Sequence, residues 1–272
     1  LEPGVRLETC DGLDVSGLGV RGGYRAVHLG GTSVSVWTNV ALVGGGRGVY
    51  SSFQCDPAKT RHEWRNARIE AIPRGMTVGY DARCGSHRIV ASEVLANGVA
   101  AEYGGAPNNV VALKADRHAQ RVAVRVLGSE LRAVLDAPNA GAIPVAVVQA
   151  DNGAEIDVTG SVLEVASTQA HAVEALRADS GGRIRVEAAA YRLATRVPGT
   201  VTRIRAGGGE IEAAHHWATL PDPAQTPGYR STHGADTGVL KATADGHPHP
   251  VVYDQSCPAA TPWYDVQDER CR

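Results

Sequence analysis

Side chains suited to holding a sugar gather near two stretches that read as loops, residues 56–63 and 103–109. Tyrosine and tryptophan occur there together with arginine, aspartate and asparagine. Aromatic rings stack on the apolar faces of sugars, while fixed polar groups meet the hydroxyls. The combination predicts a glycan-binding surface, whose candidate residues are Tyr50, Lys59, Arg61, His62, Trp64, Arg65, Tyr80, Asp81, Arg83, Tyr103 and Asn108.

A catalytic interpretation of the same loops stays open. A polysaccharide lyase needs a base and a cation that neutralises a uronate carboxylate, which Lys59, Arg61, His62 or Arg65 could supply. Loops also carry polar residues for solubility alone. No catalytic residue is assigned, and the sequence leaves open whether the protein is an enzyme.

Other chemical motifs are weak or absent. The chain has no Gly-rich phosphate loop ending in Lys-Ser/Thr, no His-Glu-x-x-His and no Cys-x-x-Cys. His247 and His249 could ligate a metal with His233 or Asp245. We favour a polar loop, because no carboxylate or cysteine lies at a motif spacing. The sequence therefore predicts neither a metal nor a cofactor.

The elements that must position these residues are short strands that repeat. Three similar phrases begin at Glu155, Arg183 and Glu210, each reading charged, Ile, charged, apolar. Alternation with period two is typical of a strand with one buried face. Recurrence every 27 or 28 residues, with Gly, Asn and Asp between the phrases, predicts a solenoid in which Ile156, Ile184 and Ile211 line up inside.

Earlier phrases extend the repeat to about eight coils. Irregular coils longer than 18 residues favour an all-β fold, a single-stranded right-handed parallel β-helix over residues 13–220. Residues 162–178 suit a helix by composition, but they match the other strand phrases. We expect an N-terminal cap at residues 1–12 and a Pro-rich tail at 221–272 without ladder strands.

The cysteines support this register. Cys55 and Cys84 each follow an equivalent valine by six residues and lie 29 residues, one coil, apart. Neighbouring coils are spaced closely enough for a disulfide, so we predict that they are bonded. Cys257 and Cys271 flank a short terminal loop and are paired too, which leaves Cys10 over. Two bridges predict an extracellular, periplasmic or cell-surface location.

Composition limits the partners. A net charge of -2 and a pI near 6.6 give no reason to expect nucleic acid or an anionic membrane surface as partner. No apolar run approaches the roughly 18 residues of a membrane span. The expected partner is a glycan or another cell-surface component. A further domain missing at either terminus stays open.

Over residues 13–219 the coil phrases resemble the right-handed parallel β-helix superfamily, the pectate-lyase-like fold of polysaccharide lyases, polygalacturonase-type hydrolases, phage tailspikes and adhesins. Only the architecture resembles it. The polygalacturonase Asn-Thr-Asp and Gly-His-Gly motifs and the pectate lyase Trp-x-Asp-His motif are missing, so no catalytic residue carries over. Three hypotheses follow: a non-catalytic glycan- or surface-binding protein such as an adhesin, a polysaccharide lyase or glycoside hydrolase, and a structural rod.

Overall fold

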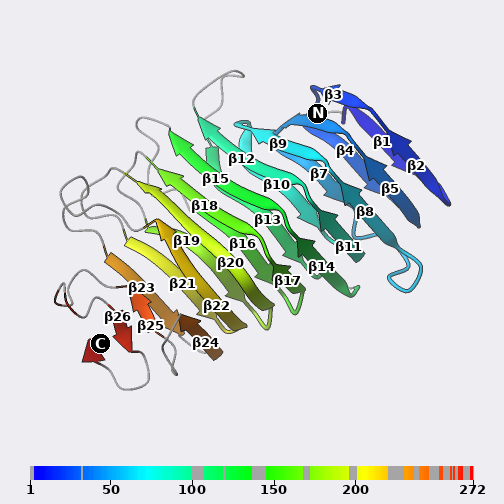
Figure 1. Ribbon diagram of the computed structural model, residues 1–272. Coiled ribbons are helices and arrows are strands. Elements are labelled where there is room, and N and C mark those ends of the chain that lie inside the picture. Colours follow the sequence, from blue (N-terminus) through cyan, green and yellow to red (C-terminus); the bar gives the residue numbers. More distant parts are fainter. Residues whose placement is uncertain are drawn as a thin grey trace.

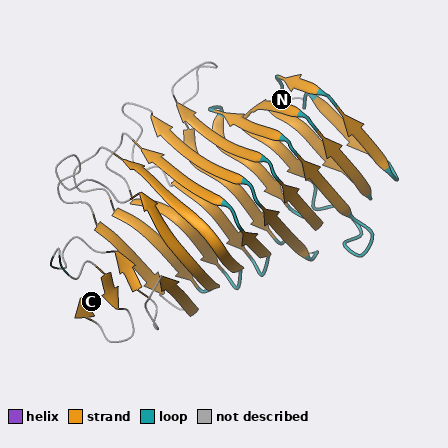
Figure 2. Cartoon of the chain, viewed as in Figure 1, coloured by secondary structure: helices purple, strands orange, loops and turns teal. Residues whose placement is uncertain are grey.

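The computed structural model describes residues 3–31, 33–99, 107–118, 120–136, 145–167, 172–195, 201–219, 230–235, 239–244, 251–253, 258, 260, 263–265 and 270–271. All regular structure in these ranges is β-strand, and no helix occurs in them (Figure 2). The strands stack in chain order into an elongated rod, with β1–β3 at one end and β23–β24 towards the other (Figure 1).

The rod has three faces, each a ladder of parallel strands. Face A contains β1 (Val5–Glu8), β4 (Arg25–Gly30), β7 (Arg47–Ser51), β10 (Gly75–Ala82), β13 (Pro107–Asp116), β16 (Val145–Asp151), β19 (Ala172–Asp179), β21 (Val201–Gly207) and β23 (Arg230–Ala235). Face B begins with β2 (Leu13–Ser16), β5 (Val34–Thr38), β8 (Arg61–Arg65), β11 (Gly85–Val90), β14 (Val122–Leu127) and β17 (Glu155–Thr159). Face C begins with β3 (Gly19–Arg21), β6 (Ala41–Gly45), β9 (Arg68–Ile72), β12 (Glu93–Val99), β15 (Glu130–Asp136) and β18 (Val162–Ser167).

Faces B and C merge in the later coils. Strand β20 (Arg183–Thr195) pairs with both β17 and β18, so one long strand serves both faces. Strands β22 (Glu210–Thr219) and β24 (Val239–Ala244) stack on it in turn. A small antiparallel sheet of β25 (Val251–Tyr253), β26 (Trp263–Asp265) and β27 (Arg270–Cys271) follows.

The chain is thus an all-β, right-handed parallel β-helix, as the coil phrases predict. Three expectations about the extent of the β-helix need correction. β23 and β24 pair in parallel with β21 and β22, so the expectation that ladder strands stop before Pro221 is wrong. The described strands form nine coils rather than about eight. β1, within the expected cap, is itself the first strand of face A.

The core is the column of inward side chains shared by the three faces. Ile156, Ile184 and Ile211 pair directly from coil to coil and are at most 2% exposed, which confirms the predicted column. Burying each isoleucine contributes about 1.5–3 kcal/mol. Only one side of each strand meets this core, which is why parallel strands keep the alternation. The stretch 162–178 contributes β18 and β19, not a helix.

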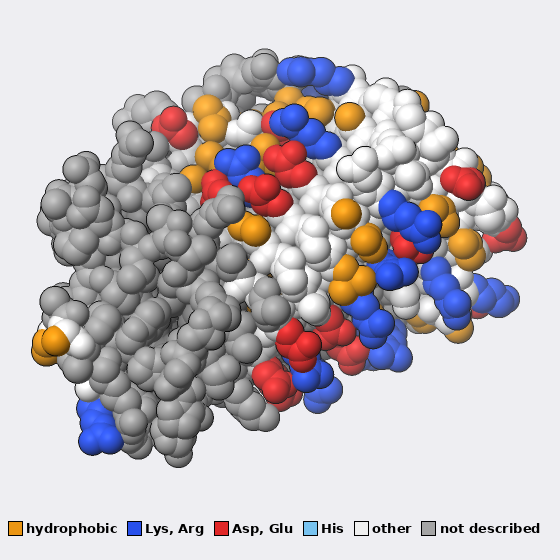
Figure 3. All heavy atoms as spheres, in the orientation of Figure 1, with side chains coloured by type: hydrophobic (Ala, Val, Ile, Leu, Met, Phe, Trp, Pro, Cys, Tyr) orange, Lys and Arg blue, Asp and Glu red, His pale blue; other side chains and the backbone are white. Residues whose placement is uncertain are grey.

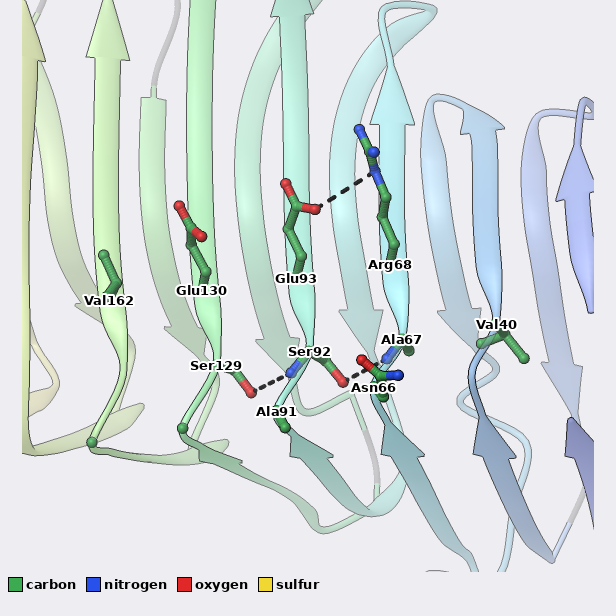
Figure 4. Close-up of a pocket in the computed structure, with 12 residues that line it drawn as sticks. Val40, Asn66, Ala67, Arg68, Ala91, Ser92, Glu93, Ser129, Glu130 and Val162 are labelled. Carbon is green, nitrogen blue, oxygen red and sulfur yellow. Dashed lines mark hydrogen bonds and ion pairs between the residues drawn. The ribbon is translucent and has the colours of Figure 1, made fainter. Parts of the chain in front are cut away.

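Faces B and C meet at a corner made by one left-handed residue per coil. Positive φ angles occur in successive coils at Gly17, Asn39, Asn66, Ala91, Gly128 and Gly160. The next residue is serine in three coils, and these serines form a ladder (Figure 4). Each hydroxyl accepts the backbone N–H one coil earlier and donates to the carbonyl two residues before it. The ladder satisfies backbone groups that a sharp corner would leave unpaired.

Ala91 is strained at this corner, with a φ of 46°, where its neighbours in the stack are Asn66 and Gly128. The left-handed conformation costs a residue with a Cβ atom about 1–2 kcal/mol. Glycine relieves this strain but loses more backbone entropy on folding. We therefore expect Ala91→Gly to raise the free energy of unfolding, measured by urea titration, by a net amount of about 0.5–1 kcal/mol. The matched control, Ala123→Gly on strand β14, should lower it by about as much. A loss of stability in both variants would contradict the corner argument.

The disulfide prediction is confirmed for one pair. Cys55 and Cys84 are bonded, with their Cα atoms 6.1 Å apart across neighbouring coils. Cys271 is disulfide-bonded, but Cys257 lies outside the described residues, so that pairing stays a prediction. Cys10 is a free thiol.

Candidate functional site on face B

Strand β8 shows how the chain divides its side chains between the core and face B. Arg61, Glu63 and Arg65 point outward, whereas His62 and Trp64 are 3% and 0% exposed. Successive side chains of a strand point to opposite faces, so neighbouring strands repeat this division. The outward side chains of β5, β8, β11, β14 and β17 therefore form one continuous surface.

These side chains line a groove of about 640 Å³ that crosses five coils, which we call the arginine groove. Its outward side chains belong to Val34, Val36, Arg61, Glu63, Ser86, Arg88, Arg121, Ala123, Arg125, Glu155 and Asp157. Arg65 extends from β8 beside it. In the space-filling view, Lys and Arg side chains gather over the N-terminal coils of face B, and Asp and Glu side chains follow further along the rod (Figure 3).

The charges of face B alternate along the rod except at one place. One row of paired residues reads Glu63, Arg88, Arg125, Asp157, Arg185 and Glu212 in successive coils. Opposite charges face each other at every step but Arg88–Arg125. Like charges directly opposite are destabilising on a sheet. An anion held between the two guanidinium groups would restore the alternation.

Two ion pairs of the groove are exposed and exchangeable, whereas Glu63, whose side chain is 21% exposed, is held by Arg65 at 2.8 Å and by Arg88 at 3.2 Å. Arg121 contacts Glu155 at 3.1 Å and Arg125 contacts Asp157 at 3.8 Å, yet the two arginine side chains are 72% and 69% exposed. Exposed pairs of this kind are worth about 0–1 kcal/mol. Arg61 has no carboxylate partner in the described part of the chain. These guanidinium groups can therefore turn to a ligand at little cost.

Beneath the groove lies a buried network of polar and aromatic side chains. The rings of Trp37 and Trp64 stack at 4.8 Å, and Trp64 donates its N–H to the Tyr80 hydroxyl at 2.7 Å. Tyr80 donates to Nδ1 of His87 at 2.8 Å, because Nε2 of His87 donates to the Cys84 carbonyl. The network fixes the floor of the groove.

His62 completes this floor but is no catalytic base. Burial, reinforced by His87, lowers the pKa of His62 to about 3, and burial lowers the pKa of His87 to about 4. Ser35 Oγ lies 2.7 Å from Nδ1 of His62, as in a nucleophile–base pair. Ser35 is only 1% exposed, however, and accepts the Trp37 N–H. The pair therefore lies beneath the groove surface with almost no solvent exposure.

A second charged cluster lies on face A. Asp81 is fully buried and accepts hydrogen bonds from Nε of Arg47 at 2.8 Å and Nε of Arg83 at 2.7 Å. Arg83 also contacts Asp116 at 2.8 Å. Burial would raise the pKa of Asp116, but the hydrogen bond from Asn152 and the nearby cations hold it below its usual range. An ionised, paired carboxylate does not serve as a general acid.

The predicted glycan-binding residues therefore do not form one site. Arg61 and Arg65 lie at the arginine groove, and Lys59 is exposed on the preceding loop, paired with Asp56. The core holds His62, Trp64 and Tyr80, so the expected aromatic platform of Trp64 and Tyr80 is wrong: both side chains are 0% exposed. Face A holds Tyr50, Asp81 and Arg83, and the Tyr50 ring is covered by Arg25 at 4.0 Å. Asn108 is exposed at the start of β13, and Tyr103 lies outside the described residues.

Sequence reasoning missed three groove arginines, Arg88, Arg121 and Arg125. The signal was present, because the coil register places Arg88 beside Arg125 and Glu63. The alternation Arg-His-Glu-Trp-Arg in β8 likewise assigns Trp64 to the core side.

A second hollow, of about 520 Å³, follows the corner between faces B and C (Figure 4). Its floor is the serine ladder, and Arg68 and Glu93 pair across it at 3.6 Å. Because the serine hydroxyls of this hollow already form hydrogen bonds with the backbone, they are not available to bind a ligand.

Comparison with known proteins does not assign the chain to a family. No family model, curated protein or solved structure matches the chain. Among the described residues, no helix is long and apolar enough to cross a membrane.

Proposed function

We propose that this protein is a secreted or cell-surface β-helix that binds an acidic glycan in the arginine groove, without catalysis. The observation that carries the proposal is the break in charge alternation at Arg88 and Arg125. Arg61, which has no carboxylate partner among the described residues, lies one coil away on the same face. A carboxylated or sulfated sugar supplies the missing negative charge.

The geometry suits an extended chain. Coils repeat at about 4.8 Å, so the arginines of β8, β11 and β14 cover roughly 10 Å along the rod. Guanidinium groups bind carboxylate and sulfate-like oxygens through paired hydrogen bonds. Val34, 40% exposed, and Val36 provide an apolar strip beside them for sugar faces. The groove is open along the rod and could follow a linear polymer.

Absence of catalysis is favoured by the state of the candidate groups. His62 is buried with a pKa of about 3, and Asp116 is held ionised by its partners. Neither is suited to proton transfer near neutral pH. The disulfide between Cys55 and Cys84 supports an oxidising compartment, where a glycan partner would be met.

The test compares binding to polygalacturonate, heparin, neutral dextran and double-stranded DNA by calorimetry. We expect binding to at least one acidic glycan, weakening with salt, and no binding to dextran. The double variant Arg88→Gln/Arg125→Gln should lose at least about tenfold in affinity. Arg185 is an exposed arginine of the same row, but it lies between two acidic residues, Asp157 and Glu212. The affinity of Arg185→Gln should therefore stay within about twofold of the wild-type affinity.

Three outcomes would overturn the proposal: no binding to either acidic glycan, equal losses in the groove variant and in Arg185→Gln, or DNA binding as tight as glycan binding. Release of reducing ends or unsaturated uronates from a bound glycan would replace it with the lyase or hydrolase hypothesis.

A further inference from the structure

Two connections at the corner between face A and face B are longer than the connections in the coils that follow. Residues 52–60 join β7 to β8, and residues 117–121 join β13 to β14. The next two coils turn this corner within residues 152–154 and 180–182. The first long loop leads directly into Arg61 and the second ends at Arg121, and both arginines line the arginine groove. This corner is therefore continuous with the groove.

The loop of residues 52–60 carries an exposed aromatic ring. Phe53 is the only phenylalanine of the chain, and it is 47% exposed. Two residues further on, Cys55 is bonded to Cys84, so a disulfide ties this loop to the next coil. A ring whose loop is already cross-linked loses little conformational entropy when a ligand stacks on it.

His118, on the second long loop, lies beside this ring. The ring centroids of Phe53 and His118 are 6.0 Å apart, and the two ring planes are inclined by 62°. The His118 side chain is 52% exposed, and its Nε2 accepts a hydrogen bond from Arg83 at 2.6 Å. Arg83 is itself held by Asp81 and Asp116. A buried ionic cluster thus fixes one ring of an exposed pair.

His118 also borders a hollow of about 500 Å³, whose other lining residues are Arg117, Asn152, Gly153 and Ser180. Arg117 extends over the next coil, where a Cβ atom at Gly153 would lie 3.5 Å from its Nη1. Among the described residues, Arg117 has no ion-pair partner and the Ser180 hydroxyl has no hydrogen-bond partner. A guanidinium group and a hydroxyl are therefore available to a ligand in this hollow.

We propose that Phe53, Arg117, His118 and Ser180 form a second contact surface, the corner ledge, for the acidic glycan of the arginine groove. This inference rests on the proposed function. A sugar ring stacks on the Phe53–His118 pair, while Arg117 binds an acidic substituent and Ser180 meets a hydroxyl. The occupant is an acidic glycan because the ledge combines a stacking surface with a cation that lacks a carboxylate partner.

One polymer can contact the ledge and the groove together. Arg117 and Arg121 are four residues apart, so their Cα atoms are separated by at most about 14 Å. The ledge extends from the coil of β8 to the coil of β20, and coils repeat at about 4.8 Å. The ledge therefore follows the rod beside the groove, and a glycan in the groove can place an adjoining sugar on it.

The stacking contact is tested by calorimetry with polygalacturonate and heparin. Phe53→Ala should weaken binding of the glycan that the wild type binds by about threefold to tenfold. Phe53→Trp, which keeps an aromatic face, should stay within about twofold of the wild-type affinity. The matched control is Val99→Ala, which shortens another exposed apolar side chain, on face C, and should change the affinity less than about twofold.

The ionic contact is tested by Arg117→Gln, which should weaken binding about threefold or more. The affinity of this variant should also depend less on salt than the wild-type affinity, because one screened ionic contact is lost. Phe53→Ala should keep the salt dependence of the wild type, since the ring carries no charge. Thermal unfolding should give the same midpoint for both variants and the wild type within a few degrees.

These measurements separate the ledge from the groove. The ledge is wrong, while the groove proposal stands, if Arg88→Gln/Arg125→Gln weakens binding but either Phe53→Ala or Arg117→Gln binds as the wild type does. Equal losses in Phe53→Ala and Phe53→Trp would also refute the ledge, because the loop would then act through its structure and not through stacking. A wild-type protein that binds neither glycan would refute both proposals.

Discussion

Lowering the pH from about 6.5 to 4 is expected to destabilise this protein by roughly 3–6 kcal/mol through two buried histidines. Burial, with a smaller contribution from His87, lowers the pKa of His62 from 6.5 to about 3, and burial lowers that of His87 to about 4. The His62 imidazole is therefore mostly neutral in the folded protein throughout this range, and the His87 imidazole is neutral over most of it and about half protonated at pH 4.

The sign follows from the unfolded state. There both histidines take up protons near pH 6.5, while in the folded state they do so only near pH 3–4. The unfolded chain binds more protons in between, so the stability present above pH 6.5 is lost as the pH falls. Below both pKa values the two states bind equally and the loss levels off.

Urea unfolding at a series of pH values measures this loss. In His62→Gln and His87→Gln the free energy of unfolding should fall less steeply between pH 6.5 and 4, whatever its value at pH 7. His118→Gln is the control, because the His118 side chain is 52% exposed. Parallel profiles for the wild type and both core variants would show that these histidines are not responsible.

Asp81→Asn is expected to destabilise the fold by about 3–5 kcal/mol. Asp81 is fully buried between Arg47 and Arg83, each 9% exposed, and receives a hydrogen bond from Nε of each. Removing its charge leaves two buried guanidinium groups with less than their full compensation. An uncompensated buried charge costs far more than the loss of an exposed pair.

The matched control is Asp157→Asn on face B. Asp157 pairs with Arg125 at 3.8 Å, but its side chain is 50% exposed. We expect a change within about 0.5 kcal/mol for this variant. Thermal and urea unfolding of both variants at neutral pH measure the difference. Similar losses for the two would mean that burial does not set the strength of the Asp81 cluster.

The site could be predicted only in part. Arg61 and Arg65 have the chemistry of a binding site and do lie at the groove, but the loop pattern groups them with Tyr80 and Trp64, which lie in the core. A loop-centred interpretation brings together residues that are close along the chain. A solenoid instead brings together residues one coil apart on the same face, as Arg88 and Arg125 show.

The ladders also extend further than proline density predicts. Pro density after Pro221 argued against further strands, yet β23 and β24 continue the ladders. A proline disrupts a ladder strand only when the proline lies inside that strand. Residues 230–235 and 239–244 contain no proline and pair normally.

By itself, the sequence determined the repeat. Period-two phrases recurring at coil length specify stacked strands, and with them the Ile156–Ile184–Ile211 column and the Cys55–Cys84 bond. Only the tertiary structure showed that the outward side chains of five neighbouring strands border one groove. Corner geometry and coil length determine which strands become neighbours. The local alternation of polar and apolar residues specifies neither of these two features. The arginine groove and the buried Asp81 cluster arise from that long-range registration.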